Sequence, residues 1–227
     1  MMSHCKKILI TALICHALPL FAGVMGSENT PASYDGFYAG ATLGLSNLTN
    51  KEQHIITPES HQLGSLGILG GGFVGYDYHI NEIFNIGLEG FGNATGLNVS
   101  IQHDTQGTSY TTNSHYQAGL RVLPGYQFSP SMQGHIILGY SNAHFQVKDS
   151  GNYGYINTDF HKNGLQGGLG WTTQIIQGFE IRVDMMYTAF GSQSSTGTGL
   201  PSSGVPQQVY TNDFNTLEGD LSLVYKF

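Results

Sequence analysis

Imidazole is the side chain in this sequence best suited to chemistry, because it binds Zn²⁺ or Cu²⁺ and exchanges protons near neutral pH. Three histidines fall near the ends of predicted strands: His115, His144 and His161. Three others fall in predicted polar connections: His54, His61 and His103. No two of them have the compact spacing of metal ligands, so we expect scattered polar residues and neither a metal nor a cofactor site.

Ser141 and His144 offer a nucleophile and a base, the pair that a hydrolase acting on lipid would need. They lie three residues apart in a predicted strand, where side chains at that spacing point to opposite faces. No acidic residue at a matching position completes a triad. We therefore predict that the chain is not an enzyme.

Charged side chains that alternate with apolar ones form a further candidate set. They are Glu89, Arg121, Glu180, Arg182, Asp184, Glu218 and Asp220. Glu89 and Arg121 lie nearly symmetrically about one predicted connection, and Arg182 and Asp220 (or Glu218) about another. Charges enclosed in a narrow interior must pair, because an unpaired buried ion is costly. We interpret the set as a structural network of ion pairs; a gated path for protons or ions is the alternative.

The composition is unusual for a soluble domain. Charged residues make up 10% of the 227 residues, against about 25% in ordinary soluble domains. Glycine is abundant at 32 residues, and 13 Tyr and 12 Phe accompany it. Few charges with many glycines and aromatic rings favour a chain whose outer face contacts lipid.

The first residues predict export. Two lysines followed by an apolar run from Ile8 to Leu20 are typical of a secretory signal peptide, predicted over 1–26. Residues 27–35 form a short segment before the main domain. Both cysteines lie in the signal, so we expect no disulfide framework. Removal of the signal takes two of the 8 basic residues and none of the 15 acidic ones. The resulting charge of −9 (6 − 15) argues against nucleic-acid binding.

Period-two alternation is clearest in residues 217–227, which have apolar residues on one face and mostly polar ones on the other. A strand of about 9–11 such residues crosses a bilayer as part of a barrel. Seven further segments alternate similarly: 36–45, 66–78, 84–97, 115–126, 134–147, 161–172 and 179–190. In 134–147 two opposite assignments of the outer face remain open. We predict an all-β domain over 36–227, an eight-stranded antiparallel transmembrane β-barrel.

The connections and the aromatic residues support this arrangement. Three connections are short (79–83, 127–133 and 173–178), whereas four are long and polar (46–65, 98–114, 148–160 and 191–213). In outer-membrane barrels short turns face the periplasm and long loops face outward. We expect a periplasmic aromatic girdle at the short-turn ends of the strands. Its members are Phe37, Tyr76, Phe84, Tyr126, Trp171 and Phe179.

Short motifs resemble a known family. GFYAG at 36–40, GY at 75–76 and LEG at 88–90 are similar to the small outer-membrane barrels of the OmpA and opacity-protein type. The last strand resembles the C-terminal signal through which such barrels meet the barrel-assembly machinery. That signal would consist of Leu221, Leu223, Tyr225 and Phe227. The resemblance covers about 34–227 and implies a monomer in the bacterial outer membrane, surrounded by lipid and lipopolysaccharide.

A rigid barrel that displays four polar loops is best suited to a structural or surface-interaction role. We expect an adhesin-like protein whose loops, the fourth (191–213) above all, contact host surface molecules. A small ion- or solute-conducting channel is the alternative. A lipid A-modifying enzyme and a soluble lipocalin-like binder are weaker alternatives.

Overall fold

The computed structural model describes residues 35–54, 60–103, 108–151, 154–196, 198–199 and 209–227. The predicted signal peptide, 1–26, lies outside these residues, as does most of the segment 27–35. Among the described residues, no helix has the length and apolarity needed to cross a bilayer.

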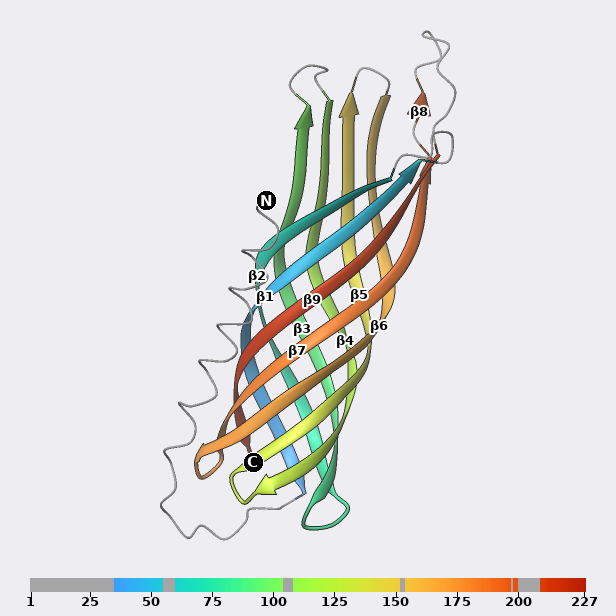
Figure 1. The fold of residues 1–227 in the computed structure, drawn as a ribbon. Coiled ribbons are helices and arrows are strands. Elements are labelled where there is room, and N and C mark those ends of the chain that lie inside the picture. The colour runs from blue at the N-terminus through green and yellow to red at the C-terminus, as the bar shows by residue number, and fades with distance from the viewer. Residues whose placement is uncertain (1–34, 55–59, 104–107, 152–153, 197, 200–208) are drawn as a thin grey trace, which may run out of the picture. The chain divides into compact units, whose positions relative to one another are not determined.

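Within this described part, eight long antiparallel strands form one closed barrel (Figure 1). They are β1 (Gly36–His54), β2 (Ser60–His79), β3 (Phe84–His103), β4 (Thr108–Ser129), β5 (Met132–Gly151), β6 (Gly154–Ile176), β7 (Phe179–Thr196) and β9 (Val209–Lys226). Each strand pairs with its neighbours in the chain, and β1 pairs with β9 to close the ring. A two-residue strand, β8 (Thr198–Gly199), pairs with the start of β6. The predicted fold class is confirmed.

The strands are longer than predicted, at 18 to 23 residues. Most residues of the predicted long loops belong to strands: β1 continues to His54, and β2 begins at Ser60. The alternation of polar and apolar residues inverts in these extensions, with apolar side chains facing inward. The pattern used to predict the strands therefore did not extend into them. Near the outer end of β1, Leu48 is fully buried while Asn47 on the outer face is exposed.

The structure settles which side of β5 faces outward. Ile136, Leu138 and Tyr140 are about half exposed on the outer wall, whereas Ile137 and Ala143 are buried in the lumen. The sequence left this open because both faces of β5 carry apolar residues.

Three irregularities interrupt the ladders toward the long-loop end, one of them between Ala94 and Leu97 of β3. On β4, His115 lies between Ser114 and Tyr116, which pair with successive residues of β5, so His115 is an extra residue. On β7, Phe190 is extra before Gly191, whose φ is +70°. A glycine at this position avoids the strain that a side chain would suffer at positive φ.

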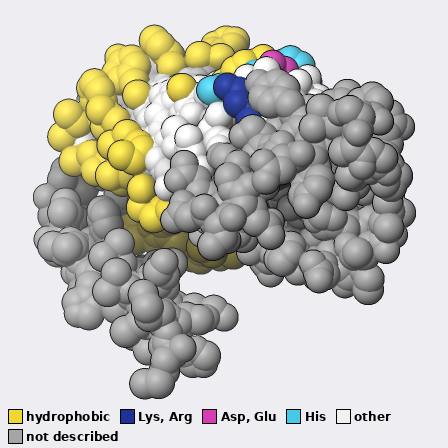
Figure 2. Space-filling model, turned by 90° about the horizontal axis from the view of Figure 1, so that it is seen from above, with side chains coloured by type: hydrophobic (Ala, Val, Ile, Leu, Met, Phe, Trp, Pro, Cys, Tyr) yellow, Lys and Arg dark blue, Asp and Glu magenta, His cyan; other side chains and the backbone are white. Residues whose placement is uncertain are grey.

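An apolar belt surrounds the barrel. Large hydrophobic side chains such as Val74, Leu88, Leu120 and Leu169 are 59–65% exposed. Hydrophobic side chains run along one side of the molecule in the view from above (Figure 2). Charged residues such as Glu89 and Arg121 are instead buried inside. This inversion of the soluble pattern is stable where hydrocarbon, and not water, surrounds the wall.

Candidate functional site

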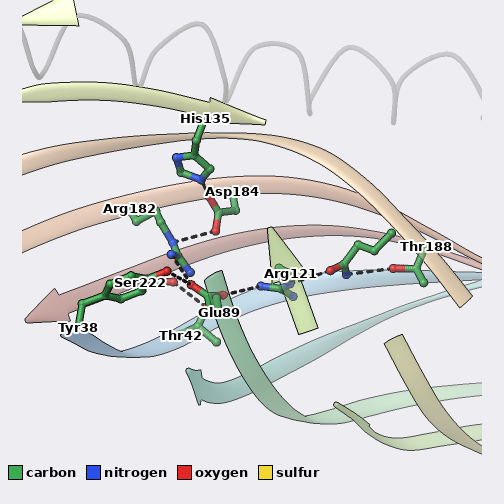
Figure 3. Close-up of polar contacts among 10 residues, drawn as sticks. Tyr38, Thr42, Glu89, Arg121, His135, Arg182, Asp184, Thr188 and Ser222 are labelled. Atoms are coloured by element: carbon green, nitrogen blue, oxygen red, sulfur yellow. Dashed lines mark hydrogen bonds and ion pairs between the residues drawn. The ribbon is translucent and has the colours of Figure 1, made fainter. Parts of the chain in front are cut away.

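The middle of the lumen is organised around Glu89 of β3, which is fully buried. One carboxylate oxygen lies 3.4 Å from Nη1 of Arg121, the residue directly opposite on β4. The other accepts a 2.7 Å hydrogen bond from Nη1 of Arg182 on β7 and one of 3.3 Å from the Tyr38 hydroxyl (Figure 3). A single carboxylate therefore connects four strands across the lumen.

Arg182 extends this network toward a histidine. Its Nε lies 3.0 Å from Oδ2 of Asp184, and Oδ1 of Asp184 lies 2.9 Å from Nε2 of His135. The guanidinium carbon of Arg182 also lies 3.9 Å from the centre of the Phe73 ring. Such stacking adds a cation–π attraction to the ion pairs. The guanidinium group of Arg182 thus has ion-pair partners in its plane and an aromatic ring above it.

Arg121 is held on its other side by a chain of neutral groups. Its Nε donates to Oε1 of Gln166 at 2.7 Å, and the Gln166 amide donates to the Thr188 hydroxyl at 3.1 Å. The guanidinium carbon lies 3.6 Å from the centre of the Phe91 ring. Linked hydrogen bonds of this kind restrict each member to one orientation.

A second group of charges lies near the short-turn end. Nζ of Lys226 on β9 is 3.1 Å from a carboxylate oxygen of Asp77 and 3.3 Å from one of Glu180. A cavity beside this cluster has a volume of about 20 Å³, comparable to the space that holds one water. Side chains therefore leave little space beside Lys226 at the short-turn end of the lumen.

Glu218 and Asp220 are placed differently from our expectation. We expected one of them opposite Arg182, but Ser222 takes that register position. Asp220 instead pairs across the ladder with Asp184. Among the described residues, neither Glu218 nor Asp220 has a cation within ion-pairing distance, although the Ser46 hydroxyl lies 3.5 Å from Glu218.

Above the charges, the outer part of the lumen contains a hydrophobic plug. Its buried members are Leu48, Leu97, Ala143, Phe145, Val147, Phe190 and Phe214, and Phe160 packs against them. The rings of Phe145 and Phe214 are fully buried, with their centres 4.9 Å apart. Sequence reasoning missed this plug. The sequence did carry an indication of the plug, because its segments place aromatic residues on one face and polar residues on the other.

The predicted girdle residues lie mostly on the outer wall. The exposed members are Phe37, Tyr76, Phe84, Tyr126 and Trp171, while Phe179 is half-buried. Their rings make contacts around the wall, with centres 5.0 Å apart for Phe37 and Tyr76 and 5.3 Å apart for Phe84 and Tyr126. Their anchoring at lipid headgroups stays a prediction.

The proposed assembly signal also faces outward. Leu221, Leu223, Tyr225 and Phe227 are 41–79% exposed on the outer side of the last strand and the residue after it. Recognition of these residues by the barrel-assembly machinery stays a prediction.

Comparisons with solved structures find several outer-membrane proteins. OprG of Pseudomonas aeruginosa has 13% identity and a TM-score of 0.48, covering 86% of this chain and 97% of that chain. The attachment invasion locus protein Ail of Yersinia pestis, solved with the heparin analogue sucrose octasulfate, has 13% identity and a TM-score of 0.43, with coverages of 85% and 99%. Neisserial surface protein A has 12% identity and a TM-score of 0.45, with coverages of 85% and 97%.

No curated protein matches the chain in sequence. The model of the outer membrane protein beta-barrel domain family matches residues 17–227, which includes every described strand. The chain therefore belongs to the outer membrane protein β-barrel domain family, and its apolar belt contacts the lipid of a bacterial outer membrane.

Proposed function

We propose that this barrel is a closed structural protein of the adhesin-like type, which holds its outer loops away from the membrane for contact with host surface molecules. The observation that carries the proposal is the composition of the lumen. An aromatic plug lies above a connected network of ion pairs, and Phe145, Phe214 and Glu89 are fully buried. A lumen filled in this way favours display over conduction.

The length of the strands supports display. A strand of 20 residues such as β3, rising about 3.3 Å per residue and tilted by about 40°, spans about 50 Å along the barrel axis. The apolar belt of such barrels is about 25 Å tall. The outer ends of the strands would therefore extend beyond the lipid, stabilised by the hydrophobic plug inside them.

Conductance tests the closed lumen. The purified barrel in a planar lipid bilayer should give no resolvable single-channel steps. The Phe145→Ala variant should also give no resolvable steps, because the ion pairs around Glu89 still fill the lumen beneath the plug. Reproducible steps from the unmodified barrel would show that the lumen conducts and would favour the channel alternative.

Loop replacement tests the adhesive role. The connection before β9 includes residues 200–208, part of the predicted fourth loop, which lie outside the described residues. Replacing them with a short Gly-Ser linker should reduce the attachment of bacteria carrying the barrel to host cells. A control replaces 80–82 in the turn between β2 and β3, at the opposite end of the barrel.

Both variants must first be shown to fold, by the change in gel mobility that folded small barrels undergo on boiling in SDS. Equal attachment by the loop variant, the turn variant and the unmodified protein would refute the contribution of this loop.

A further inference from the structure

Four rings form one patch on the outer wall of β4, β5 and β6. His144 and His161 are directly opposite each other in the β5–β6 ladder, with ring centres 5.1 Å apart. Tyr116, opposite His144 on β4, stacks on it at 5.4 Å. His115, the extra residue of the β4 irregularity, lies 5.5 Å from His144. The strands thus assemble three histidines that are far apart in the sequence.

The patch lies beyond the apolar belt. Tyr140 and Leu165 form an outward pair that is 51% and 73% exposed. The next outward pair toward the loops is polar, and its Asn142 amide donates a 2.7 Å hydrogen bond to Asn163. The histidine pair follows one outward position further. Ions in the external medium can therefore reach its rings.

We propose that His144 and His161 form the anchor of a binding site for a divalent transition-metal ion of the Zn²⁺ or Cu²⁺ class. Two imidazoles on one tetrahedral ion, with metal–nitrogen bonds of about 2.0 Å, have ring centres about 5 Å apart. The 5.1 Å between these rings meets this requirement. The imidazoles lie on neighbouring strands of a closed barrel, so their backbones are already fixed for chelation.

Asp159 supplies the nearest further donor. Its Oδ1 is 3.9 Å from Nε2 of His144, beyond the span of about 3.3 Å between two donors bonded to one tetrahedral ion, so the Asp159 side chain must move slightly closer to bind the same ion. No group of three His, Cys, Asp or Glu side chains among the described residues is already arranged around one ion position. Asp159 and His115 are exposed, so rotation of either side chain can complete the coordination shell.

An anionic group such as phosphate is the competing occupant of the patch. The charged neighbours on the same outer face are Lys148 of β5 and Asp159 of β6, whose formal charges cancel. Neutral imidazoles add no positive charge, but each offers a lone pair to a metal. The patch therefore favours a cation that prefers nitrogen ligands.

The experiment uses the mature barrel refolded in detergent. Isothermal titration calorimetry measures its affinity for Zn²⁺. We expect one Zn²⁺ per chain, with affinity at least tenfold weaker in the double variant His144→Asn/His161→Asn. His79→Asn is the matched control, because His79 ends β2 at the short-turn end of the barrel. It should bind Zn²⁺ like the unmodified protein. The boiling-dependent gel shift verifies that each variant is folded.

Electron paramagnetic resonance of bound Cu²⁺ provides an independent measure. The spectrum should show hyperfine coupling to at least two imidazole nitrogens, and the double variant should lose it. Zn²⁺ affinity and Cu²⁺ spectra that are unchanged in the double variant would assign binding to other histidines and overturn the proposal. Binding of inorganic phosphate without binding of Zn²⁺ would also overturn it, in favour of an anion site.

Discussion

At the scale of single residues, Glu89 is the centre of the polar network in the lumen. Its carboxylate accepts hydrogen bonds from Arg121, Arg182 and the Tyr38 hydroxyl, which come from three other strands. The guanidinium groups also stack on aromatic rings. Such a network repays the cost of burying its charges only while every member has a partner.

We predict that Glu89→Gln lowers the free energy of unfolding by about 3–5 kcal/mol, because it leaves two buried guanidinium groups without their shared anion. Urea unfolding in lipid vesicles, monitored by the gel shift, measures this change in the free energy of unfolding. A loss below about 1 kcal/mol would show that Arg121 and Arg182 do not depend on Glu89.

Neutralising Asp220 should have a different effect on the free energy of unfolding from neutralising Glu89. In the described middle of the lumen, four buried carboxylates (Glu89, Asp184, Glu218 and Asp220) face two guanidinium groups (Arg121 and Arg182). Asp220 lies opposite Asp184 in the ladder. We therefore predict that Asp220→Asn keeps or increases the free energy of unfolding in the same assay, because it removes one uncompensated charge at constant shape. A loss comparable to that of Glu89→Gln would contradict this.

At the scale of elements, the close approach of β2 and β3 depends on where glycine lies. A Cβ added to Gly71, on the lumen side, would collide with the Asn93 side chain and the Gly92 carbonyl. A Cβ added to Gly92, on the outer wall, would meet nothing within 4 Å. The two glycines belong to paired strands but serve different purposes.

We predict that Gly71→Ala lowers the free energy of unfolding by about 1–3 kcal/mol, because the collision involves backbone that cannot move without disturbing the ladder. Gly92→Ala, the matched control, should be nearly neutral. Thermal unfolding monitored by circular dichroism in detergent compares the two variants. Equal effects would mean that backbone flexibility, and not close approach, determines the cost.

At the scale of the whole molecule, stability requires a nonpolar exterior and a filled interior. Leu120 is 63% exposed and lies on β4 between the outward aromatics Tyr116 and Tyr126. Asn47 is exposed on the outer wall of β1, beyond Leu45. The two positions therefore sample the centre and the edge of the lipid-facing surface.

We predict that Leu120→Arg lowers the free energy of unfolding in lipid vesicles by about 2–4 kcal/mol, because it places a charge near the centre of the bilayer. Asn47→Arg should cost about 0–1 kcal/mol, as expected near an interface. Equal costs at the two positions would contradict the placement of the belt.

The sequence by itself determined the strands, the outward face of most of them and the pairing of Glu89 with Arg121 across one hairpin. These features are local, because alternation follows from strand geometry and hairpin register follows from nearby turns. It did not determine the outward face of β5, where both faces are apolar, nor the extent of the strands beyond the belt, where the polarity pattern inverts.

The tertiary structure alone brought Arg182 to Glu89 across 93 residues of sequence, gathered Phe145 and Phe214 into the plug, and set His144 beside His161. Contacts across the lumen depend on how the closed sheet tilts and staggers its strands, which no single segment encodes. His144 and His161 both lie within predicted strand segments, but the sequence left the outward face of 134–147 open, so only the β5–β6 register places the two imidazoles side by side.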